Sequence, residues 1–180
     1  MRIHTSSPEP GSFDLYTATI QGIVGDTTRL TLIDLCCGEL SHVAQLPWKE
    51  SMHVDVLDWP TRPKVGAFIQ GDAVDVLRQE LREGHRYDVA LCSDGIEHML
   101  PQRGFQLLAR MATIANTAII FTPMGNILGM NPTSMDPHQH KSAWMPDDFV
   151  ELGWNVAAFG NWHFSMNAGA FFAWTHKDIT

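Results

Sequence analysis

Residues 32–40, with the sequence Leu-Ile-Asp-Leu-Cys-Cys-Gly-Glu-Leu, constrain the fold of this chain more than any other segment. The apolar run that carries Asp34 is typical of a buried strand, and Gly38 allows the backbone to turn sharply into a helix. A strand, a glycine turn and a helix opening form the first unit of a nucleotide-binding α/β sheet. The segment therefore predicts an open sheet that binds its ligand at the carboxyl ends of parallel strands.

The remaining sequence alternates between strand-like and helix-like segments. Apolar runs predict strands at residues 30–36, 52–57, 65–70, 87–93, 117–122, 154–159 and 168–175. Helical spacing predicts helices at residues 13–24, 39–46, 101–115 and 146–152, and another that follows an Asp72 or Asp75 cap and runs to Gly84. No helix fits between the last two strands, so they should form an antiparallel hairpin. The predicted fold is α/β: a seven-stranded, mostly parallel sheet with an antiparallel last hairpin and helices on both faces.

Length, charge and cysteine usage narrow the class of protein. The 180 residues suffice for one domain, which we place at residues 11–180 behind a flexible arm at residues 1–10. Twelve basic against twenty acidic residues give a formal net charge of −8 without a basic cluster, so no nucleic-acid partner is expected. No apolar stretch approaches the roughly 18 residues of a membrane span, so no membrane association is expected either. Cys36, Cys37 and Cys92 lie in apolar contexts without CxxC spacing, which indicates reduced, buried thiols in a cytoplasmic protein.

Polar side chains gather where the predicted strands end. The first strand leads to Gly38, and the second carries Asp55, with Asp58 shortly after it. The third ends in Gly71-Asp72-Ala73, and the fourth ends in Ser93-Asp94-Gly95-Ile96-Glu97-His98. Because the carboxyl ends of parallel strands share one edge of the sheet, these residues should surround a single ligand site.

In this order, the segments resemble the motifs of class I S-adenosylmethionine-dependent methyltransferases. The first motif of that family usually reads Asp/Glu-x-Gly-x-Gly-x-Gly; Asp34 and Gly38 match it, whereas Cys36 and Leu40 replace its first and third glycines. The resemblance covers about residues 30–175 and includes the segments 87–89, 94–98, 122–125 and 142–149.

This resemblance implies S-adenosyl-L-methionine as the cofactor and methyl transfer to a small-molecule acceptor as the reaction. Asp55, or alternatively Asp58, would accept the ribose hydroxyls, and Asp72 would contact the adenine edge, cap the following helix, or do both. Gly38 would let the backbone approach the cofactor, and Asp34 would support the turn or reach the methionine amino group through water. The expected cofactor-binding residues are Asp34, Cys36, Gly38, Asp55, Asp72, Ala73 and Ser93.

The segment 123–145 is too long and too apolar for a free linker, so it should cover the acceptor site or pack for stability. His98, His138 and His140 are candidates for a general base or for orienting the acceptor, together with Glu97, because imidazoles exchange protons near neutral pH. Glu97 and His98 could instead be a structural helix-entry pair. His138 and His140 form an isolated His-x-His without an assured third ligand, so no metal site is predicted.

Two other kinds of protein compete with this interpretation. The missing glycines at Cys36 and Leu40 would suit a non-catalytic cofactor-binding or scaffolding protein. A nicotinamide-dependent oxidoreductase has a similar sheet, but it requires GxGxxG after the first strand, and residues 38–43 read Gly-Glu-Leu-Ser-His-Val.

Overall fold

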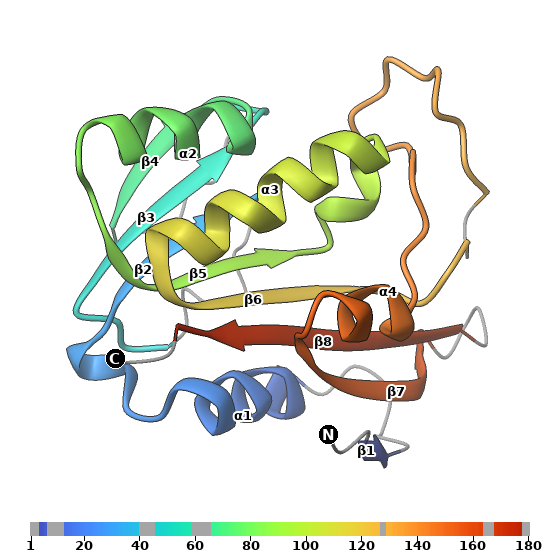
Figure 1. Ribbon diagram of the computed structural model, residues 1–180, viewed down its shortest axis with the longest axis horizontal. Coiled ribbons are helices and arrows are strands. Elements are labelled where there is room, and N and C mark those ends of the chain that lie inside the picture. Colours follow the sequence, from blue (N-terminus) through green and yellow to red (C-terminus); the bar gives the residue numbers. More distant parts are fainter. Residues whose placement is uncertain are drawn as a thin grey trace.

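The computed structural model describes residues 4–6, 13–39, 46–58, 66–126, 129–163 and 168–177. These residues form one mixed sheet with helices on both faces (Figure 1). The strands are β1 (His4–Ser6), β2 (Thr31–Leu35), β3 (Glu50–Asp55), β4 (Ala67–Gln70), β5 (Tyr87–Ser93), β6 (Ala115–Pro123), β7 (Asn155–His163) and β8 (Ala168–His176). The helices are α1 (Phe13–Val24), α2 (Ala73–Arg82), α3 (Pro101–Ile114) and α4 (Pro146–Glu151), with short 3-10 helices η1 (Thr27–Arg29) and η3 (Ile96–His98).

The strand order is β1-β7-β8-β6-β5-β2-β3-β4. β8 runs antiparallel to β6 and β7, and the other described neighbours are parallel. The predicted seven-stranded sheet with its antiparallel last hairpin is therefore confirmed, and β1 adds an eighth strand at the edge beside β7. This strand corrects the expectation of an irregular arm for residues 4–6.

The two faces of the sheet bury separate cores. α1 covers one face, where Tyr16 and Ile20 pack against Phe121 and Phe172. α2, α3 and α4 cover the other face (Figure 1), and they bury an apolar side from each helix, with Leu77, Met111 and Phe149 among the fully covered side chains. The apolar runs at the centres of β5 and β6 follow from this arrangement, because a strand covered on both sides has no solvent face.

The strand order reverses between β2 and β5. β3 and β4 continue the sheet on one side of β2, and β6 continues it beyond β5 on the other. The segments that leave the carboxyl ends of β2 and β5 therefore run to different sides and open a crevice, which is where sheets of this kind bind ligands. The expected helix at 39–46 and the loop after β3 lie largely outside the described residues, as does Leu40.

Candidate functional site

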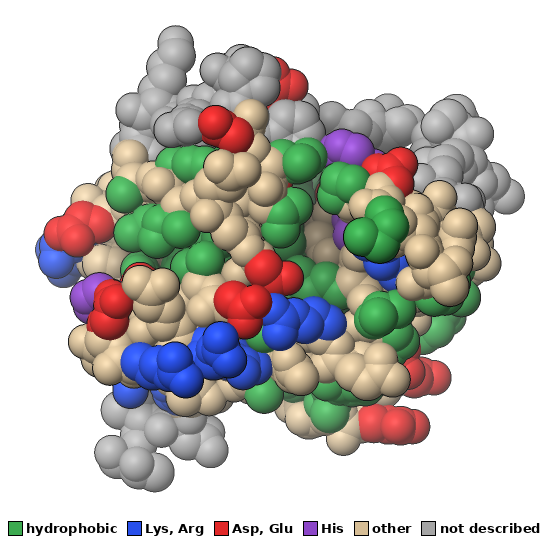
Figure 2. Space-filling model, turned by 90° about the horizontal axis from the view of Figure 1, so that it is seen from above, with side chains coloured by type: hydrophobic (Ala, Val, Ile, Leu, Met, Phe, Trp, Pro, Cys, Tyr) green, Lys and Arg blue, Asp and Glu red, His purple; other side chains and the backbone are tan. Residues whose placement is uncertain are grey.

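A cleft of about 630 Å³ lies at the carboxyl edge of the sheet, beside the point where the strand order reverses. Its wall comes from the segments that follow β2, β3, β4 and β5, from the start of α3 and from residues 132–141. Figure 2 views the molecule from the side of α2 and α3 and shows a hollow bordered by histidine, acidic and hydrophobic side chains. The fold thus brings strand ends that are distant in sequence into one concave surface.

Asp55 joins the turn after β2 to the segment after β3. Its Oδ2 accepts a 2.9 Å hydrogen bond from the backbone amide of Gly38, and its Oδ1 accepts one of the same length from the amide of Leu57. The residue is only 8% exposed but still lines the cleft. Asp58, the alternative ribose ligand, is not among the lining residues in the described part of the chain. Of the two predicted alternatives, the geometry favours Asp55.

Cys36 takes the backbone conformation that a glycine would normally take in this turn. Its φ is 58°, in the left-handed region that side chains with a Cβ rarely occupy, and Gly38 follows at 64°. The Cys36 side chain packs tightly on Gly95, where a Cβ would lie 2.6 Å from the Cys36 Cβ. The turn therefore keeps a left-handed geometry although the first glycine of the motif is absent.

Asp34 and Ser93 lie behind the cleft. Asp34 is buried, and its Oδ2 is 3.1 Å from Nδ1 of His53, whose Nε2 in turn contacts the Ser51 hydroxyl. Ser93 shares a hydrogen bond with the Tyr16 hydroxyl of α1. Neither Asp34 nor Ser93 belongs to the cleft lining in the described residues, so Asp34 fits the turn-supporting role better than direct contact.

Asp72 caps α2 and also faces the cleft. Its Oδ1 accepts hydrogen bonds from the amides of Val74 and Asp75, and Nη2 of Arg103 lies 2.6 Å from the same oxygen. Ala73 and Gly71 line the cleft beside it. Sequence reasoning missed Arg103, because nothing in the periodicity of α3 distinguishes this arginine from an ordinary surface cation.

Glu97 is a buried carboxyl group next to His98, which lines the cleft. It is 3% exposed, and its Oε2 accepts a 2.9 Å hydrogen bond from the Thr122 hydroxyl. Its backbone carbonyl accepts hydrogen bonds from the amides of Lys141 and Ser142. Burial, reinforced by the nearby charge of Asp94, raises the pKa of Glu97 to about 8. A carboxyl group of this kind exchanges its proton near neutral pH.

His98 and His140 lie together beside Glu97. The rings of His98 and His140 meet edge to face with centroids 4.9 Å apart, and His140 is only 5% exposed. Burial and the neighbouring imidazole of His140 lower the pKa of His98, which keeps its ring neutral near pH 7. His138 is exposed and lines the cleft with His98.

The described part of the segment 123–145 is anchored near its two ends and exposed between them. The Gly125 amide donates a 2.8 Å hydrogen bond to the Trp144 carbonyl. The Lys141 and Ser142 amides donate to the Glu97 carbonyl, and these bonds hold residues 140–145, the returning chain, beside η3. Trp144 is buried against Gly104 of α3, whereas Met135 is 94% exposed. The anchored returning chain and the exposed tip both fit the expected position over the cleft; closure over an acceptor stays a prediction.

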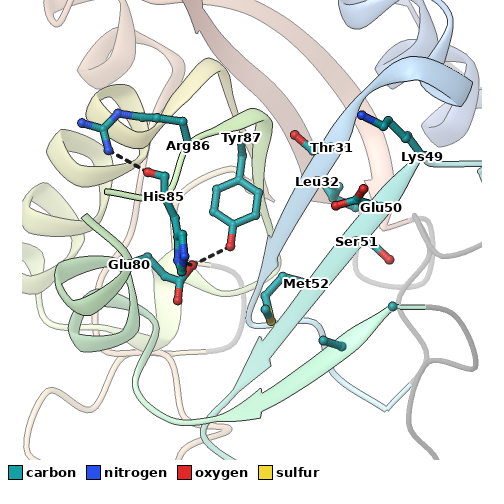
Figure 3. Close-up of a pocket in the computed structure, with 12 residues that line it drawn as sticks. Thr31, Leu32, Lys49, Glu50, Ser51, Met52, Glu80, His85, Arg86 and Tyr87 are labelled. Atoms are coloured by element: carbon teal, nitrogen blue, oxygen red, sulfur yellow. Dashed lines mark hydrogen bonds and ion pairs between the residues drawn. The ribbon is translucent and has the colours of Figure 1, made fainter. Parts of the chain in front are cut away.

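A second cavity of about 600 Å³ lies at the opposite edge, by the start of β2 and β3 (Figure 3). Tyr87 points its hydroxyl at Glu80 and donates a 2.6 Å hydrogen bond to Oε2, which also lies 2.9 Å from Nδ1 of His85. Glu80 is therefore already bonded within the protein. This cavity is remote from the crevice at the carboxyl ends, so we assign it no part in the main site.

No protein-family model and no curated protein matches the chain, but solved structures match its fold. A SAM-dependent methyltransferase from Archaeoglobus fulgidus is 17% identical, with a TM-score of 0.56 over 92% of this chain and 95% of that chain. Magnesium protoporphyrin IX methyltransferase from Synechocystis PCC 6803, solved with bound SAH, is 14% identical, with a TM-score of 0.61 over 91% of this chain and 80% of that chain. The small RNA methyltransferase HEN1 is 16% identical, with a TM-score of 0.59 over 90% of this chain and 25% of that chain. The chain has the class I, Rossmann-like methyltransferase fold.

Proposed function

We propose that this chain, which has the class I methyltransferase fold, binds S-adenosyl-L-methionine in the cleft and transfers its methyl group to a small-molecule acceptor. The observation that carries the proposal is the bond between the Gly38 amide and Asp55, because it fixes a close-approach turn and a carboxylate at the point where the strand order reverses. Among the described helices, none is long and apolar enough to cross a membrane.

The lining residues match the parts of the cofactor. The turn at Cys36 and Gly38 would receive the methionine end, and Asp55 would receive the ribose. A carboxylate has about four acceptor positions; the amides of Gly38 and Leu57 use two on Asp55, so positions remain for ribose hydroxyls. Asp72 and Ala73 would contact the adenine edge while Asp72 continues to cap α2.

When bound, S-adenosylmethionine supplies a methyl group that its sulfonium centre already makes electrophilic. The protein then has to align the acceptor in line with that methyl group and keep water away from it. His98 and His138 line the acceptor side of the cleft, and a neutral imidazole there can accept a proton from a hydroxyl or an amine. Glu97 and His140 lie behind them as positioning residues.

The charge of the cleft supports a small acceptor over a nucleic acid. The described lining holds the carboxylates Glu39, Asp55, Asp72 and Asp94 but only two cations, Arg103 and Lys141. Arg103 is already paired with Asp72 and Asp75. A polyanionic acceptor needs clustered unpaired cations, and this wall does not supply them. Methyltransferases of similar fold carry names that specify acceptors as different as a magnesium porphyrin and a small RNA, so the fold itself does not select among them.

The competing hypothesis of a non-catalytic binding protein rests on the missing glycines. The left-handed φ of 58° at Cys36 argues against it at that position, because the backbone turn persists without glycine. Both hypotheses predict that the chain binds the cofactor, but only the enzyme hypothesis predicts that the methyl group is transferred.

Calorimetry with S-adenosylmethionine, S-adenosylhomocysteine and NAD tests the binding step. We expect heat with both sulfur nucleotides and none with NAD; no heat with either sulfur nucleotide would overturn the proposal. A cofactor labelled in its methyl group, incubated with a cell extract, tests the reaction, and the label should appear in molecules that pass a small-pore filter. Label recovered in RNA would contradict the small-molecule acceptor, and label that stays on the cofactor would favour the non-catalytic alternative.

A further inference from the structure

Glu97, His98 and His140 form a compact group of possible metal ligands. Each offers one ligand atom, and these atoms all lie within 4.8 Å of one another. Glu97 and His98 belong to η3, directly after β5, whereas His140 comes from the returning chain of the segment 123–145. The Lys141 and Ser142 amides, bonded to the Glu97 carbonyl, hold that returning chain in place.

Glu97 and His98 do not satisfy each other's polar atoms. Nδ1 of His98 is buried and has no hydrogen-bond partner among the described residues. Oε1 of Glu97 lies 3.9 Å from Nε2 of His98, which is too long for a hydrogen bond. A buried polar atom without a partner costs roughly 1–3 kcal/mol, so a ligand bonded to Nδ1 of His98 would remove that cost.

A second acidic and histidine group in the chain provides the contrast. Glu80, Glu83 and His85 also lie within 4.8 Å of one another, but two of the three are exposed. Oε2 of Glu80 is already within hydrogen-bond distance of the Tyr87 hydroxyl and of Nδ1 of His85 (Figure 3). Direct hydrogen bonds explain that arrangement, and no ion is needed there.

We propose that Glu97, His98 and His140 bind one divalent transition-metal ion at the acceptor side of the cleft. Two imidazoles and one carboxylate suit Zn²⁺, Fe²⁺ or Co²⁺, and three protein ligands leave a coordination position open. Of the three residues, His98 lines the cleft and the other two are buried, so the open position faces the cleft. The sequence prediction of no metal site rested on the missing third ligand of His138-x-His140; the fold pairs His140 with Glu97 and His98 instead.

This position assigns a chemical class to the acceptor, a step that rests on the proposed function. An ion there lowers the pKa of an acceptor hydroxyl, which favours O-methylation. With His98 bound to the ion as a ligand and not acting as the base, the hydroxyl releases its proton to water in the open cleft. Its oxygen forms the new bond to the methyl carbon. The carbon–sulfur bond breaks, and its electron pair passes to the sulfonium sulfur, which becomes a neutral thioether.

Cobalt binding to the chelator-treated full chain tests the site without any turnover. We expect one Co²⁺ per chain, seen by calorimetry and by the visible ligand-field bands of an ion held by nitrogen and oxygen ligands. Glu97→Gln and His140→Gln, which preserve size and hydrogen bonding, should weaken binding at least about tenfold, because losing even an outer-shell partner costs about 10- to 100-fold. His138→Ala and His85→Ala are the matched controls and should bind as the original chain does.

Three results would overturn the site: no Co²⁺ binding by the original chain, equal binding by His140→Gln and His138→Ala, or loss of binding on His85→Ala alone. Circular dichroism in chelator checks that each variant is folded, and His98→Gln replaces any variant that is not. S-adenosylhomocysteine affinity of the metal-free chain is measured separately. Cofactor binding without Co²⁺ binding overturns the metal site and leaves the proposed function; the reverse result overturns the proposed function and leaves the site.

Discussion

The backbone amide of Gly38 donates a 2.9 Å hydrogen bond to Oδ2 of Asp55, and this bond couples the turn after β2 to the end of β3. One carboxylate therefore holds the shape of the turn and presents its remaining acceptor positions to the cleft. The stability of the turn and the affinity for a nucleoside ligand should consequently change together when Asp55 is altered.

Asp55→Ala should weaken S-adenosylhomocysteine binding by roughly 1–3 kcal/mol, because ribose hydroxyls lose their acceptor and the Gly38 amide loses its partner. Calorimetry gives the affinity, and thermal denaturation without ligand gives the effect on the turn. Asp58→Ala, three residues further along the same segment, is the matched control and should retain the affinity. A larger loss in Asp58→Ala than in Asp55→Ala would show that the ribose ligand has been assigned to the wrong aspartate.

Cys36 should carry conformational strain that glycine would relieve. An L-residue in the left-handed region costs roughly 1–2 kcal/mol, so Cys36→Gly should be more stable than Cys36→Ala by about that amount, since both variants lack the thiol and only alanine keeps the Cβ. Chemical denaturation of the two variants measures the difference. Equal stabilities would mean that the surrounding structure, rather than the residue type, sets this φ.

Gly104 should be essential for the packing of the returning chain of the segment 123–145. A Cβ at Gly104 would lie 2.6 Å from Cζ2 of Trp144, so Gly104→Ala should destabilise the protein by roughly 1–3 kcal/mol through overpacking. Gly22→Ala in α1 meets nothing within 4 Å and should instead stabilise by up to about 1 kcal/mol, as expected for alanine in a helix. Denaturation curves for both variants test this, and the prediction fails if the two substitutions have the same sign.

The segment 123–145 should close over bound ligands. Its tip around Met135 is exposed while its returning chain is fixed to η3, so a broad-specificity protease should cut near the tip in the free protein. Saturating cofactor together with acceptor should slow that cleavage, because closure would shield the transferring methyl group from water. If cleavage is equally slow in all states and His98→Ala, His138→Ala and His140→Ala keep full turnover, the segment is structural packing and the catalytic groups lie elsewhere.

The sequence alone determined the sheet and most of its elements, because those depend on local patterns. Residues 87–93 are predicted as a strand and form β5 with the same bounds, since the apolar run at residues 89–92 fits a strand covered on both faces. The helices predicted at residues 101–115 and 146–152 likewise form α3 and α4 and begin at the predicted residues. Asp72 is the N-cap of α2, which is one of the two alternatives proposed. The strand-end residues resemble a methyltransferase pattern, and this resemblance could be detected from their order along the chain alone.

Tertiary structure decided the contacts between segments that are distant in sequence. Asp55 reaches Gly38, Arg103 reaches Asp72, and Trp144 covers Gly104, and no spacing rule predicts any of these pairs. The histidines show the difference most clearly: the sequence places His138 and His140 together as His-x-His, but the fold leaves His138 exposed and buries His140 beside Glu97 and His98. The physical reason is that a side chain's partners are fixed by which strand ends share an edge and which loop packs over them, and these relations exist only once the sheet has formed.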